Sequence, residues 1–141
     1  KRISKVLYRF EIPGTLPTFN DYMDKCRANK FGANKTKQDT EKLIIGCIPS
    51  DAPTFTDPVC VYMTWIRPDA RSDKDNVTFA KKFVMDALQK AGIIKRDSWN
   101  LATPYDKGYA VNKHNPRTIV EITDEIPPRF NYVIGADYAN K

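Results

Sequence analysis

A change in hydrophobic period divides the middle of the chain into a strand and a helix. Residues 58–66, with the sequence PVCVYMTWI, are rich in β-branched and aromatic side chains and are bounded by Pro58 and Pro68. This composition is typical of a strand at the centre of a sheet. Over residues 77–91 apolar side chains recur at helical spacing, and Gly92 follows as a stop signal. The pattern therefore predicts a buried strand followed by an amphipathic helix.

Weaker patterns predict the remaining helices and strands. Alternation over residues 4–12 predicts a strand, and helices are expected over residues 18–29 and 35–48. Two further strands are expected at about residues 108–113 and 117–123. Because these two strands are so close in sequence, we expect them to pair with each other in antiparallel fashion.

The length of the chain and its cysteines indicate a small protein of a reducing compartment. A chain of 141 residues suits one compact domain, which we place at residues 1–125. The tail at residues 126–141 is apolar without clear periodicity, and either docks on a partner subunit or is a poorly ordered terminus. Cys26, Cys47 and Cys60 form no CxxC pair, and no run of 18 apolar residues exists. We therefore expect a soluble, cytoplasmic protein without a membrane partner.

The charge balance favours a polyanionic partner. The chain has 23 Lys and Arg against 17 Asp and Glu, a formal net charge of +6, which attracts nucleic acids over a long range. Basic residues are frequent between residues 25 and 42, where Phe31 also lies, and they either contact phosphates or form the solvated face of two surface helices. The candidate phosphate contacts are Lys25, Arg27, Lys30, Lys35, Lys37, Arg71, Lys74 and Lys81.

Aspartates gather in one segment of this otherwise basic chain: Asp69, Asp73, Asp75, Asp86 and Asp97. A helix that begins at about residue 76 would carry Asp75, Lys82 and Asp86 on one face, at 100° per residue. Asp73 can reach the same place from the preceding loop. The turn at Gly92 leaves enough chain for Asp97 to return toward the start of the helix. Three carboxylates can therefore converge beside one lysine.

Converging aspartates of this kind suit Mg²⁺, which prefers hard oxygen ligands and retains several waters. We expect the metal to be held by Asp73, Asp75 and Asp97, where it would polarise a scissile phosphate and lower the pKa of a water molecule. Lys82 is the natural residue to offset developing phosphoryl charge. Lys81 is the alternative, although it is rotated by about 100° on the helix.

Each of these residues also has an ordinary structural interpretation. Asp75 with Asn76 could cap the helix, Lys82 and Asp86 could form an i,i+4 ion pair, and Asp97 could open a turn. From spacing alone the metal site and these interpretations remain alternatives. Acidic residues in a protein that binds DNA repel the phosphate backbone unless a cation intervenes, which favours the metal.

The segment also resembles a known family. The chain carries D-K-D-N at residues 73–76, K-x-x-x-D-A-L at 82–88, A-G at 91–92 and then Asp97, after an I-P-G-T-L-P opening at 12–17. These motifs resemble those of the RusA family of Holliday junction resolvases. The resemblance implies a homodimer with an α+β fold, magnesium at Asp73, Asp75 and Asp97, and an essential lysine at Lys82.

Two departures from the family pattern bear on the site. The spacing from Asn76 to Asp86 is about three residues longer than in the best-known members, which leaves the choice between Lys81 and Lys82 open. Arg96 stands where the first residue of an acidic pair is expected. Asp97 would then be the third metal ligand without an acidic neighbour.

Together these observations predict an α+β fold: a mixed, largely antiparallel sheet with helices packed on it, in a single domain that dimerises. The expected function is resolution of four-way DNA junctions by a protein of phage or prophage type. Its expected cofactor is Mg²⁺, with Mn²⁺ as the alternative. Asn76 and Asp86 are expected to support the ligands from behind, and Trp99 is expected to contact the DNA. The alternatives are a branched-DNA-binding module without activity and a metal nuclease acting on flaps or RNA.

Overall fold

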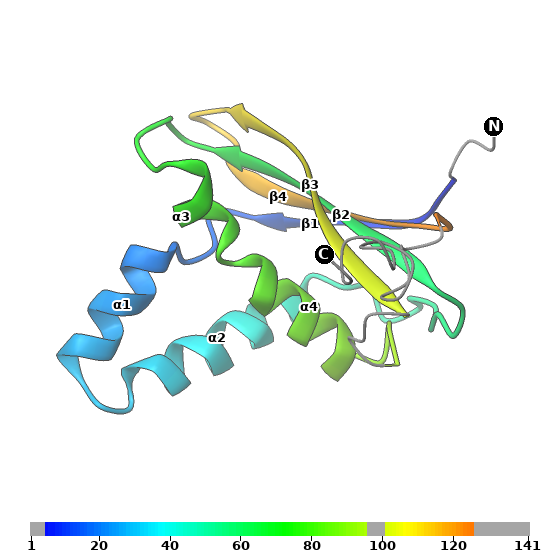
Figure 1. Ribbon diagram of the computed structural model, residues 1–141, viewed down its shortest axis with the longest axis horizontal. Helices are drawn as coiled ribbons and strands as arrows, with labels where there is room; N and C mark the ends of the chain where they lie inside the picture. The colour runs from blue at the N-terminus through cyan, green and yellow to red at the C-terminus, as the bar shows by residue number, and fades with distance from the viewer. Residues whose placement is uncertain (1–4, 96–100, 126–141) are drawn as a thin grey trace, which may run out of the picture.

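The computed structural model describes residues 5–95 and 101–125, which form one mixed sheet with helices on one of its faces (Figure 1). The expectations for Arg96, Asp97, Trp99 and the tail at residues 126–141 lie outside these described residues. No helix within the described ranges is long and apolar enough to cross a membrane. The elements in chain order are β1 (Val6–Pro13), α1 (Phe19–Ala28), α2 (Gly32–Gly46), β2 (Val59–Arg67), α3 (Lys74–Thr78), α4 (Lys81–Lys90), β3 (Ala102–Val111) and β4 (Arg117–Thr123).

The four strands lie in the order β1-β4-β2-β3, so the predicted central strand β2 is confirmed. β4 runs antiparallel to both β1 and β2, whereas β3 runs parallel to β2. The sheet is therefore mixed and largely antiparallel, as expected. The expected pairing of the last two strands with each other is wrong, because β2 lies between them. The chain leaves β2 and crosses through α3 and α4 before β3, and such a helical crossover returns the chain in the same direction.

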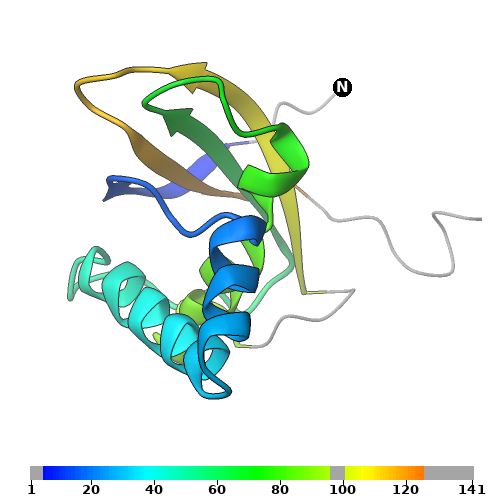
Figure 2. The same cartoon turned by 90° about the vertical axis from the view of Figure 1, so that its left-hand side faces the viewer.

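The core lies between the sheet and the helices α1, α2 and α4, which Figure 2 shows below the sheet. Alternate residues of β2 point into this core and are almost fully buried, in keeping with the period of two in a strand. The helix α4 contributes the opposite wall. The side chains that meet there include Val59, Val61, Met63, Trp65, Val120, Ile122, Phe83, Val84, Ala87 and Leu88.

The helix expected over residues 77–91 is confirmed in part: the segment is helical as α3 and α4, but a break at Phe79 and Ala80 interrupts it. At the break the amide of Ala80 bonds the carbonyl of Val77 at 3.4 Å, and the amide of Lys82 bonds the carbonyl of Phe79 at 3.4 Å. These i→i+3 bonds replace the α-helical ladder for one tight turn. The Phe79 ring packs within 5.2 Å of the Tyr22 ring in α1, which holds the break in place.

Candidate functional site

Asp73 and Asp75 lie together where the chain leaves β2 and enters α3. Asp73 is the N-cap of α3, and its Oδ1 accepts a hydrogen bond from the Asn76 amide at 2.9 Å. The side-chain oxygen of Asn76 in turn accepts a hydrogen bond from the Asn20 amide at 2.9 Å, which fixes α3 against the start of α1. Asn76 thus donates its backbone amide to Asp73 and uses its side chain to hold α1, and its expected role behind the metal ligands stays a prediction.

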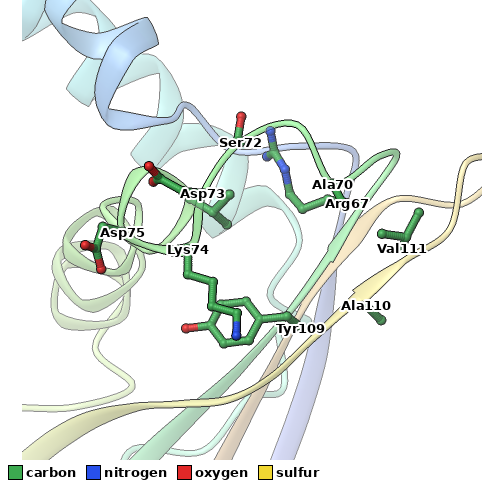
Figure 3. Close-up of a pocket in the computed structure, with 10 residues that line it drawn as sticks. Arg67, Ala70, Ser72, Asp73, Lys74, Asp75, Tyr109, Ala110 and Val111 are labelled. Atoms are coloured by element: carbon green, nitrogen blue, oxygen red, sulfur yellow. The ribbon is translucent and has the colours of Figure 1, made fainter.

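The two carboxylates point to the same side of α3, away from Arg67 and Val111 (Figure 3). Together with Phe19, Asn20 and Asn76 they line a hollow of about 370 Å³ between α1 and α3. Both aspartates are exposed. In the described part of the chain, Asp75 carries no hydrogen bond or ion pair, so its oxygens are available to a ligand.

A second and larger hollow of about 570 Å³ shares both carboxylates and extends along the other side of α3. The ring of Tyr109 forms part of its wall, and the Lys74 ammonium lies 4.8 Å from the centre of that ring. Figure 3 shows Lys74 crossing the face of the ring. The remaining lining residues are Arg67, Ala70, Ser72, Val77, Ala110 and Val111.

A lysine and a third aspartate meet beside these hollows. Lys81 Nζ lies 2.8 Å from Asp106 Oδ2, and the indole nitrogen of Trp65 donates to Asp106 Oδ1 at 2.9 Å. The Lys81 and Asp106 side chains are 28% and 24% exposed, so the pair is partly shielded from solvent. Burial raises the pKa of Tyr109, and the nearby carboxylates of Asp106 and Asp75 raise it further. Tyr109 therefore lies within electrostatic range of both Asp75 and Asp106, and Lys81 is the ion-pair partner of Asp106.

A bulge in β3 brings Asp106 and Tyr109 to the same face of the sheet. Met63 pairs with Asp106 and Thr64 pairs with Gly108, so Lys107 is an extra residue in the ladder. Without it, Asp106 and Tyr109 would point to opposite faces, because side chains alternate along a strand. Bulges are frequent beside functional sites, where they redirect a side chain. The sequence analysis missed Asp106 because it began this strand at Gly108, and that glycine within a strand was the available signal for a bulge.

Lys82 and Asp86 lie elsewhere than expected. The Lys82 side chain is 70% exposed and its Nζ lies 3.9 Å from Asp86 Oδ2, while Lys37 of α2 lies 3.8 Å from the same oxygen. The expected common face of Asp75, Lys82 and Asp86 assumed one continuous helix, whereas the chain forms α3 and α4 with a break at Phe79 and Ala80. The i,i+4 ion pair of Lys82 and Asp86, the ordinary interpretation of these two residues, is present. Lys81 is the lysine that faces the sheet, where it pairs with Asp106 of β3.

The basic residues of α1 and α2 gather near the turn between these helices. Arg27 and Lys35 are paired with Asp24 and Asp39, at 3.5 Å and 2.9 Å, and Lys37 with Asp86. Lys25 lies in the last turn of α1 and is exposed, as are Arg71 and Lys74, which stand on either side of Asp73 in the sequence. At the turn itself the Lys30 ammonium lies 5.0 Å from the ring centre of Phe31, which is 65% exposed.

The carboxylates fit a divalent cation that is bound largely through water. Within residues 5–95 and 101–125, no group of three or more acidic, His or Cys side chains converges as a metal site, and Asp97 lies outside these residues. Asp73 has one oxygen engaged in the cap, whereas Asp75 has both available. Mg²⁺ is commonly held by one or two carboxylates together with substrate phosphate, so this pair is sufficient for it.

Comparison with known proteins returns no matching family model and no matching curated protein. The resemblance to the RusA family therefore rests on the motif residues alone.

Proposed function

We propose that the protein is a divalent-metal-dependent endonuclease that hydrolyses phosphodiester bonds in branched DNA. The observation that carries this proposal is the Asp73 and Asp75 pair, which opens onto two hollows in a chain of net charge +6. A paired carboxylate of this kind repels DNA unless a cation bridges the two. Four-way junctions as substrate, a homodimer as the active form and action in the cytoplasm of a bacterial host follow from the motif resemblance.

Each residue of the site has a distinct task in this reaction. Asp75 and the free oxygen of Asp73 would hold Mg²⁺ or Mn²⁺, with Asp97 as the third carboxylate that the motif implies. The bound ion would supply charge stabilisation at the scissile phosphate and favour ionisation of the attacking water. Lys81 presents its ammonium next to the same neighbourhood, where it would offset negative charge that develops on the phosphoryl oxygens. Trp65 and Asp106 keep that lysine in place.

A second function is favoured by one specific contact. The Asp73 carboxylate caps α3, so this aspartate has a structural reason to be present without any metal. In a module that binds branched DNA and does not cut it, Asp73 would serve only as this cap. Dependence of cleavage on metal distinguishes the two functions.

The test is cleavage of a synthetic four-way junction, with a flapped DNA and an RNA strand as comparison substrates, without metal, with Mg²⁺ and with Mn²⁺, comparing the parent with Asp75→Asn. Asp69→Asn is the matched control, because Asp69 lies in the same loop, bonds the Arg71 amide at 3.0 Å and lines neither hollow. We expect paired nicks that require the metal, vanish in Asp75→Asn and persist in Asp69→Asn. Binding without nicks in Mg²⁺ and in Mn²⁺ would establish the non-catalytic module. If flaps or RNA are cut as fast as the junction, the protein is still a nuclease, but four-way junctions are not its specific substrate.

A further inference from the structure

The larger hollow has a chemistry of its own beyond the two carboxylates at one end. Its far wall is formed by the end of β3, where Tyr109 and Val111 are 42% and 58% exposed. Adjacent exposed apolar side chains that line a hollow rimmed by charged groups are typical of a ligand-binding groove. The carboxylates alone do not account for this wall.

Two cations line the same hollow. Arg67 comes from the last residue of β2 and lies beside Ser72, and Lys74 crosses the ring of Tyr109 (Figure 3). In the part of the chain that the structure describes, neither Arg67 nor Lys74 is paired with a carboxylate. Unpaired Arg and Lys beside an aromatic platform are the groups that recognise a phosphate and a base together.

We propose that this hollow binds one unpaired nucleotide of the DNA strand, adjacent to the phosphate that is cut. The base stacks on Tyr109 and lies against Val111, and its phosphate is bound by Arg67. This inference rests on the proposed function, since the carboxylates at the mouth of the hollow define where the cut phosphate lies.

The position of Lys74 explains how the free and the bound states differ. In the free protein its ammonium covers the Tyr109 ring in a cation–π contact, which is a weak interaction at an exposed site. A base that stacks on the ring displaces this ammonium, which is then available to the incoming phosphate. The lysine thus covers the platform when no DNA is bound and neutralises charge when DNA is bound.

The same geometry favours an unpaired nucleotide over duplex DNA. In a duplex both faces of every base are covered by its stacked neighbours, so a base reaches a protein ring only after it leaves the stack. A branched junction supplies strands at the crossover whose stacking is already interrupted. The hollow would therefore select branched or single-stranded DNA.

The test measures binding in EDTA, so that no cleavage takes place, with a short single-stranded oligonucleotide carrying a fluorescent base analogue. The same strand in a blunt duplex is the comparison. We expect Tyr109→Leu, which keeps apolar bulk but removes the ring plane, to weaken single-strand binding by roughly 10-fold. Tyr109→Phe should bind like the parent, and Arg67→Met should weaken binding while Arg67→Lys restores most of it. Affinity for the duplex should change little in all four variants.

Three results would overturn the nucleotide site: equal single-strand affinity in Tyr109→Leu and Tyr109→Phe, no response of the base analogue, or equal losses for single strand and duplex. The first two would show that no base reaches the ring. Failure of this inference is separable from failure of the proposed function, because Asp75→Asn abolishes cleavage without removing the stacking wall. A parent that binds single strands through Tyr109 but cuts nothing would retain the nucleotide site and refute the nuclease.

Discussion

Replacement of Lys81 by Met is the substitution that most directly tests how the site is assembled. The Lys81 ammonium lies 2.8 Å from Asp106 and is 28% exposed, whereas that of Lys82 lies 3.9 Å from Asp86 on a side chain that is 70% exposed. Loss of one positioned group that stabilises transition-state charge costs about 10²–10³-fold in rate. We therefore expect Lys81→Met to lower the single-turnover cleavage rate by roughly 100-fold or more, and Lys82→Met to change it less than about threefold.

The stability of the two variants provides the control for folding. Lys81→Met leaves Asp106 with the Trp65 hydrogen bond but without its cation, which costs about 1 kcal/mol for a pair that is only partly shielded. Such a loss leaves the fold intact, so denaturant unfolding and circular dichroism should remain close to the parent. A Lys82→Met variant that is slow and a Lys81→Met variant that cuts at the parental rate would refute the assignment of Lys81 to the site.

Two further measurements test the geometry independently of cleavage. Because burial and then the carboxylates of Asp106 and Asp75 raise the pKa of Tyr109, Asp75→Asn should lower that pKa toward its ordinary value, and Mg²⁺ bound to Asp75 should act in the same direction. Titration of Tyr ring signals by NMR, assigned with Tyr109→Phe, checks this, and an unchanged pKa would place Asp75 outside the neighbourhood. The raised pKa also means that Tyr109 contributes stability below its unfolded pKa of about 10, which is lost as the pH rises through the folded value. At the turn between α1 and α2, a Cβ on Gly32 would overlap the Lys25 carbonyl oxygen, so Gly32→Ala should destabilise the protein by about 1–3 kcal/mol in denaturant unfolding. Gly46→Ala, where a Cβ meets nothing within 4 Å, should be neutral or slightly stabilising, and equal behaviour of the two would contradict this packing.

Much of the fold was predictable because local pattern and tertiary structure agree. The strand at residues 58–66 is β2, and the helix at residues 18–29 is α1, which begins after a capping box formed by Thr18 and Asp21. β2 is largely buried, whereas α1 packs the partly buried Tyr22 against the core. Where each residue choice favours the same structure, the sequence alone is sufficient.

The order of the strands was not predictable in the same way. Closeness in sequence favoured pairing of the last two strands, yet β2 lies between β3 and β4. The deciding factor is the helical crossover from β2 to β3, which returns the chain parallel to β2 and places β3 on the edge of β2 that β4 leaves free. This is a long-range property of the sheet that no short window of sequence contains.

The carboxylate pair was predictable, whereas its surroundings depend on two local irregularities. The break at Phe79 and Ala80 separates α3 from α4, whose first residue Lys81 pairs with Asp106, and the extra residue Lys107 brings Asp106 and Tyr109 to one face of the sheet. A continuous helix would have placed Lys82 beside Asp75, and a regular strand would have pointed Asp106 or Tyr109 to the opposite face. Each irregularity interrupts the regular backbone hydrogen bonds of its element. Neither the helix nor the strand needs such an interruption in order to pack. Their coincidence around one pair of aspartates therefore favours a functional origin for both, and makes Lys81 and Asp106 as much a part of the candidate site as the motif residues themselves.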